Sequence, residues 1–156
     1  MKKNMIKILI LGITLIIIWR AFAEPFRMLG DCMEPAIQDG KLYFVNRVFP
    51  YLRKIKTGNI IIYKHEGKIW VSRVVALEGD SIGISENAIH VNGTPLNESG
   101  VKRDWANWKY GSYAIDNILQ IPIGSVFVLS DKLSAHHDDS RVFGPISKES
   151  ILGVVW

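Results

Sequence analysis

The chain contains 156 residues, of which 48% are hydrophobic and 22% are charged, and its formal net charge is +4. This length allows one domain with a core of its own but not two, and the composition fits neither a disordered chain nor one wholly embedded in a membrane. Because the sequence has a single cysteine, Cys32, it excludes an internal disulfide framework and a multi-cysteine zinc site. We expect no cofactor.

The N-terminal segment, residues 1–23, has the pattern of a membrane anchor. Its uninterrupted apolar run is short for a span of ~20 residues, but the stretch from Met5 to Ala23 is long enough when Lys7 and Arg20 extend to the membrane surface. The positive charge at the start of the chain predicts an N-terminus in the cytoplasm and residues 24–156 outside the membrane. A cleaved signal peptide is the alternative, because the Ala-Phe-Ala at the end of the segment has the small-x-small form of a cleavage site.

The remainder, residues 24–156, is expected to form one extracytoplasmic domain of β-strands. Runs rich in β-branched and aromatic residues alternate with turn sequences such as Asp-Gly, Thr-Gly and Asn-Gly, and helical periodicity is weak. The Asn-Gly pair at Asn92 predicts a hairpin, and residues 97–118 show no clear period and are expected to leave the core. We therefore predict an all-β sandwich or barrel behind one N-terminal transmembrane helix. The expected strands are 41–49, 59–65, 68–77, 88–93 and 125–131.

Four segments of the sequence resemble, in the same order, four motifs of the type I signal peptidases. These are membrane-anchored serine proteases that remove signal peptides from exported proteins. The segment GDCMEPAI resembles the end of a motif written G-S-M-x-P-T-L, and TGNIIIY resembles G-D-I-V-V-F. SRVVALEGD resembles K-R-V-V-G-L-P-G-D, and the segment from Ile121 to Ile146 resembles the last motif, which contains G-D-N-R and then S-x-D-S-R. The resemblance covers almost the whole chain, implies the family's β fold, and favours a retained anchor over a cleaved signal peptide.

The sequence departs from these motifs at the positions that carry the family's chemistry. Cys32 stands where the family has its serine nucleophile, and Ser72 stands where it has its lysine base. The Gly-Asp pair of the second motif is Gly58-Asn59, and the spacing from Asp131 to Asp139 is one residue longer than usual. The start of the last motif has become Ser130, Asp131, Lys132 and Leu133. The positions expected to support the site are Arg73, Asp131, Asp139, Ser140 and Arg141.

These replacements leave two chemical alternatives. Ser72 cannot act as a base, because its hydroxyl does not titrate near neutral pH. A thiol at position 32 is intrinsically nucleophilic and needs only a lowered pKa, which a neighbouring imidazole gives. By the resemblance, His137 lies where the family has a serine next to the lysine, with Asp138 or Asp139 to orient it. The extra residue in this segment leaves open whether His136 or His137 faces Cys32.

Cys32, the segment AHHDD and Gly30 each have a second interpretation that involves no catalysis. Cys32 in a vacated serine site is also consistent with a small, buried apolar residue, and the nearby Asp31 would raise the pKa of a thiol. The segment AHHDD is also consistent with a solvated polar loop or, less well, with a metal site. Gly30 stands where the family often has glycine or serine, which is consistent with an oxyanion pocket made of backbone N–H groups or with an ordinary turn glycine.

Two functional hypotheses follow for this membrane-bound, single-pass protein. The first is a signal peptidase homologue that binds exported or pilin-type precursors without cleaving them, in an assembly or chaperone role. The second is a working peptidase that uses Cys32 as nucleophile and His137 as base. Both predict an exported polypeptide or signal peptide, bound in extended form by strand addition, and membrane lipid as partners. The anchor and the absence of a basic recognition helix argue against nucleic acid.

Overall fold

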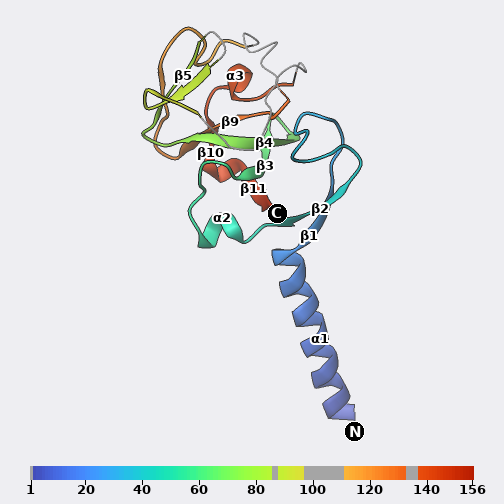
Figure 1. Cartoon of the computed structure of the whole chain (residues 1–156). Coiled ribbons are helices and arrows are strands. Elements are labelled where there is room, and N and C mark those ends of the chain that lie inside the picture. The colour runs from blue at the N-terminus through green and yellow to red at the C-terminus, as the bar shows by residue number, and fades with distance from the viewer. Residues whose placement is uncertain (1, 86–87, 97–110, 133–136) are drawn as a thin grey trace.

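The computed structural model describes residues 2–85, 88–96, 111–132 and 137–156. Residues 24–156, hereafter the β domain, form two antiparallel sheets, and the N-terminal helix extends away from them (Figure 1). The larger sheet has the order β1 (Glu24–Arg27), β2 (Leu42–Asn46), β11 (Ile151–Val155), β3 (Ile60–His65), β4 (Lys68–Leu77), β9 (Ser125–Leu129) and β10 (Ile146–Ser147). The smaller has the order β7 (Thr94–Pro95), β6 (Ala88–Val91), β5 (Ser81–Ser85) and β8 (Leu119–Gln120). The predicted all-β fold is therefore confirmed.

Four helical segments accompany the sheets, and all but the first are a single turn. They are α1 (Lys2–Phe22), α2 (Phe49–Leu52), α3 (Ser140–Phe143) and the 3-10 helix η1 (Lys148–Ser150). The large apolar side chains of α1 from Met5 to Trp19 are exposed, by between 49% at Ile18 and 71% at Ile8. Within the part of the chain that the structure describes, no helix has the length and apolar character required to cross a membrane. The predicted span stays a prediction.

The core of the β domain lies on both faces of strands β4 and β9. Phe127 and Leu129 of β9 pack into an apolar cluster shared with the smaller sheet, while Val126 and Val128 pack into a second cluster on the other face with residues of β3 and β11. Because both faces are buried, these strands have continuous apolar sequences rather than alternating ones.

The expected strands correspond to β2, β3, β4, β6 and β9, and the Asn-Gly hairpin joins β6 to β7. Asn92 and Gly93 adopt positive φ values of 52° and 74°, as a two-residue turn of this kind requires. Strands β1, β5, β8, β10 and β11 were not predicted. Of the expected excursion, residues 97–110 lie outside the described residues, while Ala114 is buried in the core shared with the smaller sheet.

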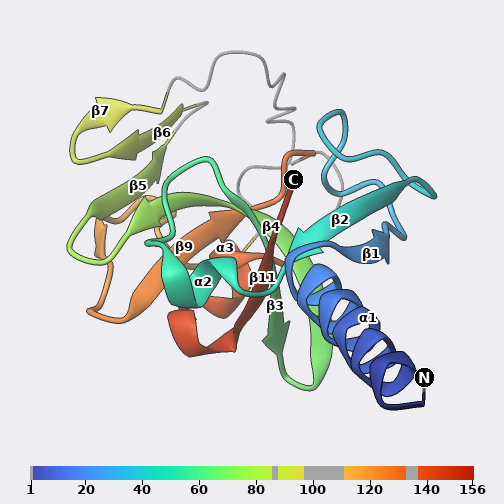
Figure 2. The same cartoon turned by 90° about the horizontal axis from the view of Figure 1, so that it is seen from below.

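The strand order leaves two strand edges facing each other. β1 is the edge strand of the larger sheet. β4 pairs with β3 along Lys68–Arg73, but its pairing with β9 on the other side extends only from Arg73 to Leu77. Within the described residues, the first half of β4 therefore has one unpaired edge. The described parts of the loop after β1 and of the segment after β9 come close to each other (Figure 2). There the Lys132 amide donates to the Cys32 carbonyl at 2.9 Å.

Candidate functional site

A groove of about 360 Å³ lies between β1 with its following loop and the unpaired half of β4. One wall comes from β1 and the residues after it, the other from β4, and the segment after β9 closes one end. The side chains along the walls are mostly apolar, and Cys32 lies at the same end as His137 and Asp138. The lining residues are Phe26, Arg27, Met28, Leu29, Gly30, Cys32, Ile69, Trp70, Val71, Ser130, His137 and Asp138.

Local packing holds Cys32 at the base of this groove. The turn that carries it is fixed by Met33 and Ile37, which are 0% and 2% exposed and pack with Met28 in an apolar cluster. The Ile37 amide donates to the Met33 carbonyl at 2.8 Å, which closes the turn. Cys32 packs partly buried against the same cluster.

The surroundings of Cys32 oppose ionisation of its thiol. Burial raises the pKa of the Cys32 thiol from 9.0 to about 11, and the negative charge of Asp31, with smaller effects from Asp131 and Asp139, acts in the same direction. The expected effect of Asp31 on the thiol pKa is therefore confirmed. At neutral pH this group is a protonated thiol, whereas the nucleophilic form of a cysteine is the thiolate.

His137 lies in the same groove as Cys32 but makes its hydrogen bond elsewhere. Its Nε2 atom is 3.0 Å from Oδ1 of Asp31, and the Lys132 ammonium pairs with the other carboxylate oxygen of Asp31. Hydrogen bonds from Lys132 and then from His137 lower the pKa of the Asp31 carboxyl to about 2. Within the described part of the chain, no hydrogen bond joins His137 to Cys32. His136 lies outside the described residues.

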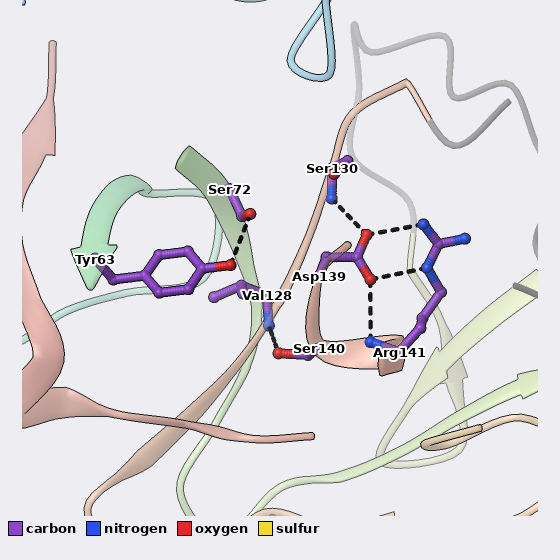
Figure 3. A network of polar contacts seen from close by, with 7 residues as sticks. All are labelled: Tyr63, Ser72, Val128, Ser130, Asp139, Ser140 and Arg141. Atoms are coloured by element: carbon purple, nitrogen blue, oxygen red, sulfur yellow. Dashed lines mark hydrogen bonds and ion pairs between the residues drawn. The ribbon is translucent and has the colours of Figure 1, made fainter. Parts of the chain in front are cut away.

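The structure places Asp31 against His137, whereas Asp138 or Asp139 was expected to orient the imidazole. Asp139 is 0% exposed and uses both of its oxygens for Arg141, at 2.9 Å to Nε and 2.8 Å to Nη2. It also accepts from the Ser130 amide at 3.0 Å (Figure 3). Because both oxygens of Asp139 are occupied by a buried bidentate ion pair, it does not orient the imidazole. Asp31, from the loop that carries Cys32, holds that place instead.

At the position of the family's lysine base, the structure has a pair of hydroxyl groups. The Ser72 Oγ and Tyr63 hydroxyl lie 3.3 Å apart, and the residues are 1% and 0% exposed. Figure 3 shows the Tyr63 ring reaching across from β3 to Ser72 on β4. Burial raises the pKa of the Tyr63 phenol far above its ordinary value. Neither group accepts a proton from a nucleophile at neutral pH.

The remaining supporting residues build the frame behind this site. Asp139 caps α3 by accepting from the Arg141 amide at 3.0 Å, and the Ser140 Oγ accepts from the Val128 amide of β9 at 2.9 Å (Figure 3). These contacts fix the segment after β9 to the end of that strand.

A second ion pair ties the start of the same segment to β4. Arg73 donates to both oxygens of Asp131, at 2.8 and 2.6 Å, and to the Gly58 carbonyl at 2.9 Å. Asp131 is 0% exposed, so the pair is largely desolvated. The two pairs, Arg73–Asp131 and Asp139–Arg141, therefore fix the described residues near the end of β9 and at the start of α3.

Gly30 does not offer the amide that an oxyanion pocket would use. Its N–H donates to Oδ1 of Asp39 at 2.8 Å, and its φ of +101° lies in the region that favours glycine. The turn conformation accounts for the glycine, and the bond to Asp39 occupies its donor.

Two residues of the site were not singled out from the sequence. Tyr63 occupies the last position of the second motif, where the family's pattern has phenylalanine, and the added hydroxyl is a signal that a new polar contact exists there. Lys132 occupies the asparagine position of the last motif. Because Asp31 lies in the first motif, about 100 residues earlier, the sequence gives no indication of the ion pair between them. Both residues, though not their contacts, could have been found by asking at each replaced motif position which polar or charged group the replacement adds.

The whole chain, residues 1–156, matches the family model described as signal peptidase, peptidase S26. A protein of Staphylococcus aureus named inactive signal peptidase IA is 29% identical over 163 residues, covering 98% of this chain and 90% of its own. Signal peptidase I of Bacillus amyloliquefaciens is 25% identical over 151 residues, covering 94% and 82%. The crystal structure of a signal peptidase I from Enterococcus faecalis matches with a TM-score of 0.52 and 26% identity, covering 65% of this chain and 97% of that one. The chain belongs to the signal peptidase family, peptidase S26.

Proposed function

We propose that this protein binds an exported polypeptide in its groove and does not cleave it. The observation that supports this most directly is that, among the described residues, no base is hydrogen-bonded to the Cys32 thiol. Its pKa is raised to about 11, and His137 is hydrogen-bonded to Asp31 instead. A peptidase needs a nucleophile activated by an adjacent base or by a lowered pKa. The relative that carries the name inactive signal peptidase IA is consistent with a family that includes non-cleaving members.

The proposed ligand is a signal peptide or pilin-type precursor in extended conformation. The unpaired edges of β1 and of β4 lie on the two sides of the groove. An extended chain placed between them forms main-chain hydrogen bonds to both, while the apolar walls receive alternate side chains. Retention of the groove without a base fits a role in holding exported chains during assembly.

We further propose that α1 anchors the β domain, as a first domain of residues 1–23 with its N-terminus in the cytoplasm. Its large apolar side chains from Met5 to Trp19 are exposed, and its main contacts with the described part of the β domain are those of its end with β1 and β2. The Thr14 hydroxyl donates to the Ile10 carbonyl at 2.9 Å, so this polar atom is satisfied within the helix. Lys7 and Arg20 would extend to the two membrane surfaces and lengthen the apolar span.

Binding and cleavage are separated by one experiment on the full chain in detergent. A fluorescent precursor peptide with a small-x-small sequence is titrated for binding by anisotropy and then incubated and examined by mass spectrometry. We expect saturable binding, no cleavage product, and unchanged binding by Cys32→Ala. Ile69→Asp, in the groove wall, should weaken binding about tenfold or more, whereas Ile123→Asp, at an exposed position outside the groove, should not.

The opposite outcome is equally clear. A product cut after the small-x-small sequence, lost in Cys32→Ala and in His137→Ala, would establish the thiol peptidase and refute the proposal.

A further inference from the structure

Large apolar side chains are exposed on the side of the β domain from which α1 extends. On α2, Tyr51 and Leu52 are 83% and 68% exposed, and Trp156 at the end of the chain is 70% exposed. Figure 1 shows α2 and the C-terminus on the side that faces α1, and the view from below in Figure 2 places α2 on the same side. These three side chains belong to none of the apolar core clusters, so they are available to a partner.

A hollow of about 550 Å³ connects these residues to the end of α1. Phe22, the last residue of α1, lines this hollow together with Leu52 and Trp156. The Trp156 amide donates to the Phe44 carbonyl at 3.1 Å, which fixes the backbone of the last residue beside β2. The exposed apolar surface of α1 therefore continues onto α2 and the C-terminal residue.

The residues that follow α2 are basic and exposed. Of the described carboxylates, none forms an ion pair with Arg53, Lys54 or Lys56. Glu78 lines a second hollow together with Arg53 and Lys54, but its Oε1 is already 2.8 Å from Nζ of Lys148. This part of the surface therefore has four basic side chains against one carboxylate, and its potential attracts anions.

We infer that α2, the basic residues after it and the C-terminal residue form a lipid-binding surface, which contacts a bilayer that contains anionic phospholipids. We define this surface by Tyr51, Leu52, Arg53, Lys54, Lys56 and Trp156. Tyrosine and tryptophan rings are amphipathic and prefer the headgroup level of a bilayer, where an apolar side chain reaches the acyl chains and lysine or arginine pairs with anionic headgroups. Exposed side chains of all three kinds meet here.

The inference rests on the anchor that we propose for α1, and not on the binding of a peptide. With α1 across the bilayer, Phe22 lies at the membrane surface, and the hollow that it shares with Leu52 and Trp156 brings both side chains to that level. Because α1 keeps the lipid-binding surface next to the bilayer, a contact too weak to retain the β domain alone is sufficient. The helix and the surface together hold the β domain, with its groove, in one orientation.

The test uses the full chain in lipid vesicles, with Cys32→Ala as the background. One cysteine, introduced by Leu52→Cys, carries a fluorophore, and spin-labelled acyl chains quench its emission on contact. The matched control is Ile118→Cys, which is 78% exposed and lies beside Gly83 of β5, on the smaller sheet away from α1 (Figure 1). Ile10→Cys reports in the same way on the insertion of α1.

In vesicles that contain anionic lipid, we expect quenching at positions 52 and 10 but not at position 118. Arg53→Gln, Lys54→Gln and Lys56→Gln together should lower the ratio of lipid-bound to released surface, read at position 52, about tenfold or more, because each cation interacts with the anionic membrane surface. The control Lys41→Gln, which removes an exposed cation before β2, should leave the ratio nearly unchanged. Vesicles of phosphatidylcholine alone should lower the ratio as the three substitutions do, which tests the charge dependence even where that variant does not fold.

The results distinguish this inference from the proposed anchor. Quenching at position 10 without quenching at position 52 overturns the inference and leaves the anchor in place, and quenching at neither position overturns both. Equal quenching at positions 52 and 118, or quenching at position 52 that depends neither on the three cations nor on anionic lipid, also overturns the inference. Quenching at position 52 but not at position 10 supports the lipid-binding surface and refutes the anchor.

Discussion

Cys32 shows how strongly its surroundings decide what a thiol does. The same side chain would be a nucleophile beside a free imidazole, but here it packs against an apolar cluster with Asp31 as its neighbour in sequence. Asp31 in turn engages His137, the side chain that was expected to activate the thiol. A single carboxylate therefore both disfavours the thiolate and holds the imidazole in a separate contact.

The rate of Cys32 alkylation against pH measures this environment. We expect iodoacetamide to react with a midpoint well above the ordinary thiol value of 9.0, towards about 11. Asp31→Asn should lower the midpoint, because it removes a negative charge next to the thiol, while His137→Ala should leave it nearly unchanged. A midpoint below the ordinary value that returns to it in His137→Ala would contradict this prediction and indicate an activated nucleophile.

Among the elements of the fold, α3 depends on a buried charge. Asp139 caps the helix and pairs with Arg141, whose side chain is 1% exposed. Asp139→Ala leaves this guanidinium in the interior without its carboxylate, which should lower the free energy of unfolding by about 3–5 kcal/mol. Urea denaturation followed by fluorescence measures the change.

A control variant tests whether the removal of an exposed carboxylate elsewhere in the chain has the same effect on stability. Glu149→Ala removes an exposed carboxylate on η1 and should change the free energy of unfolding by less than about 0.5 kcal/mol. Equal effects of the two substitutions would show that the Asp139–Arg141 pair does not contribute to stability.

A strand could be predicted from the sequence where its own residues form a recognisable pattern, and not where its residues are chosen by contacts with distant parts of the chain. β3, β4 and β9 were found because their apolar runs are continuous, whereas β1 is four residues that include a proline and two charges. β11 was missed because Gly153 interrupts it. A Cβ on Gly153 would lie 2.5 Å from Cγ1 of Val45, so this glycine is required by a neighbouring strand that is distant in sequence.

The same distinction applies to the candidate site: the sequence suggests which residues belong to it but not which side chains contact each other. The assignment of Cys32 and Ser72 to family positions rests on the order of the motifs alone and stays a prediction. Which side chain binds which depends on side-chain directions across three loops and strands. The bond from His137 to Asp31, and not to Asp139, therefore required the structure.

For the molecule as a whole, α1 and the β domain have separate roles. Within the described residues, the main contacts of the helix are those of its end with β1 and β2, in contrast to the extensive contacts between strands. We expect a chain that lacks residues 1–22 to keep the circular dichroism and thermal unfolding of the β domain and to bind peptide as the full chain does. In a cell fractionation experiment it should move from the membrane fraction to the soluble fraction. Loss of cooperative unfolding on truncation would show instead that α1 is part of the core.

The hydroxyl pair formed by Tyr63 and Ser72 also limits how a Ser–Lys dyad could be engineered into this scaffold. A lysine at position 72, in the direction of the present Ser72 side chain, would run into the Tyr63 phenol, which lies 3.3 Å from the Ser72 Oγ. Its amine would also find a thiol, not a serine, at position 32. A dyad of the kind that the family's motifs describe would therefore need changes at positions 32, 63 and 72 together, because Ser72→Lys alone would place a charged amine against a buried phenol.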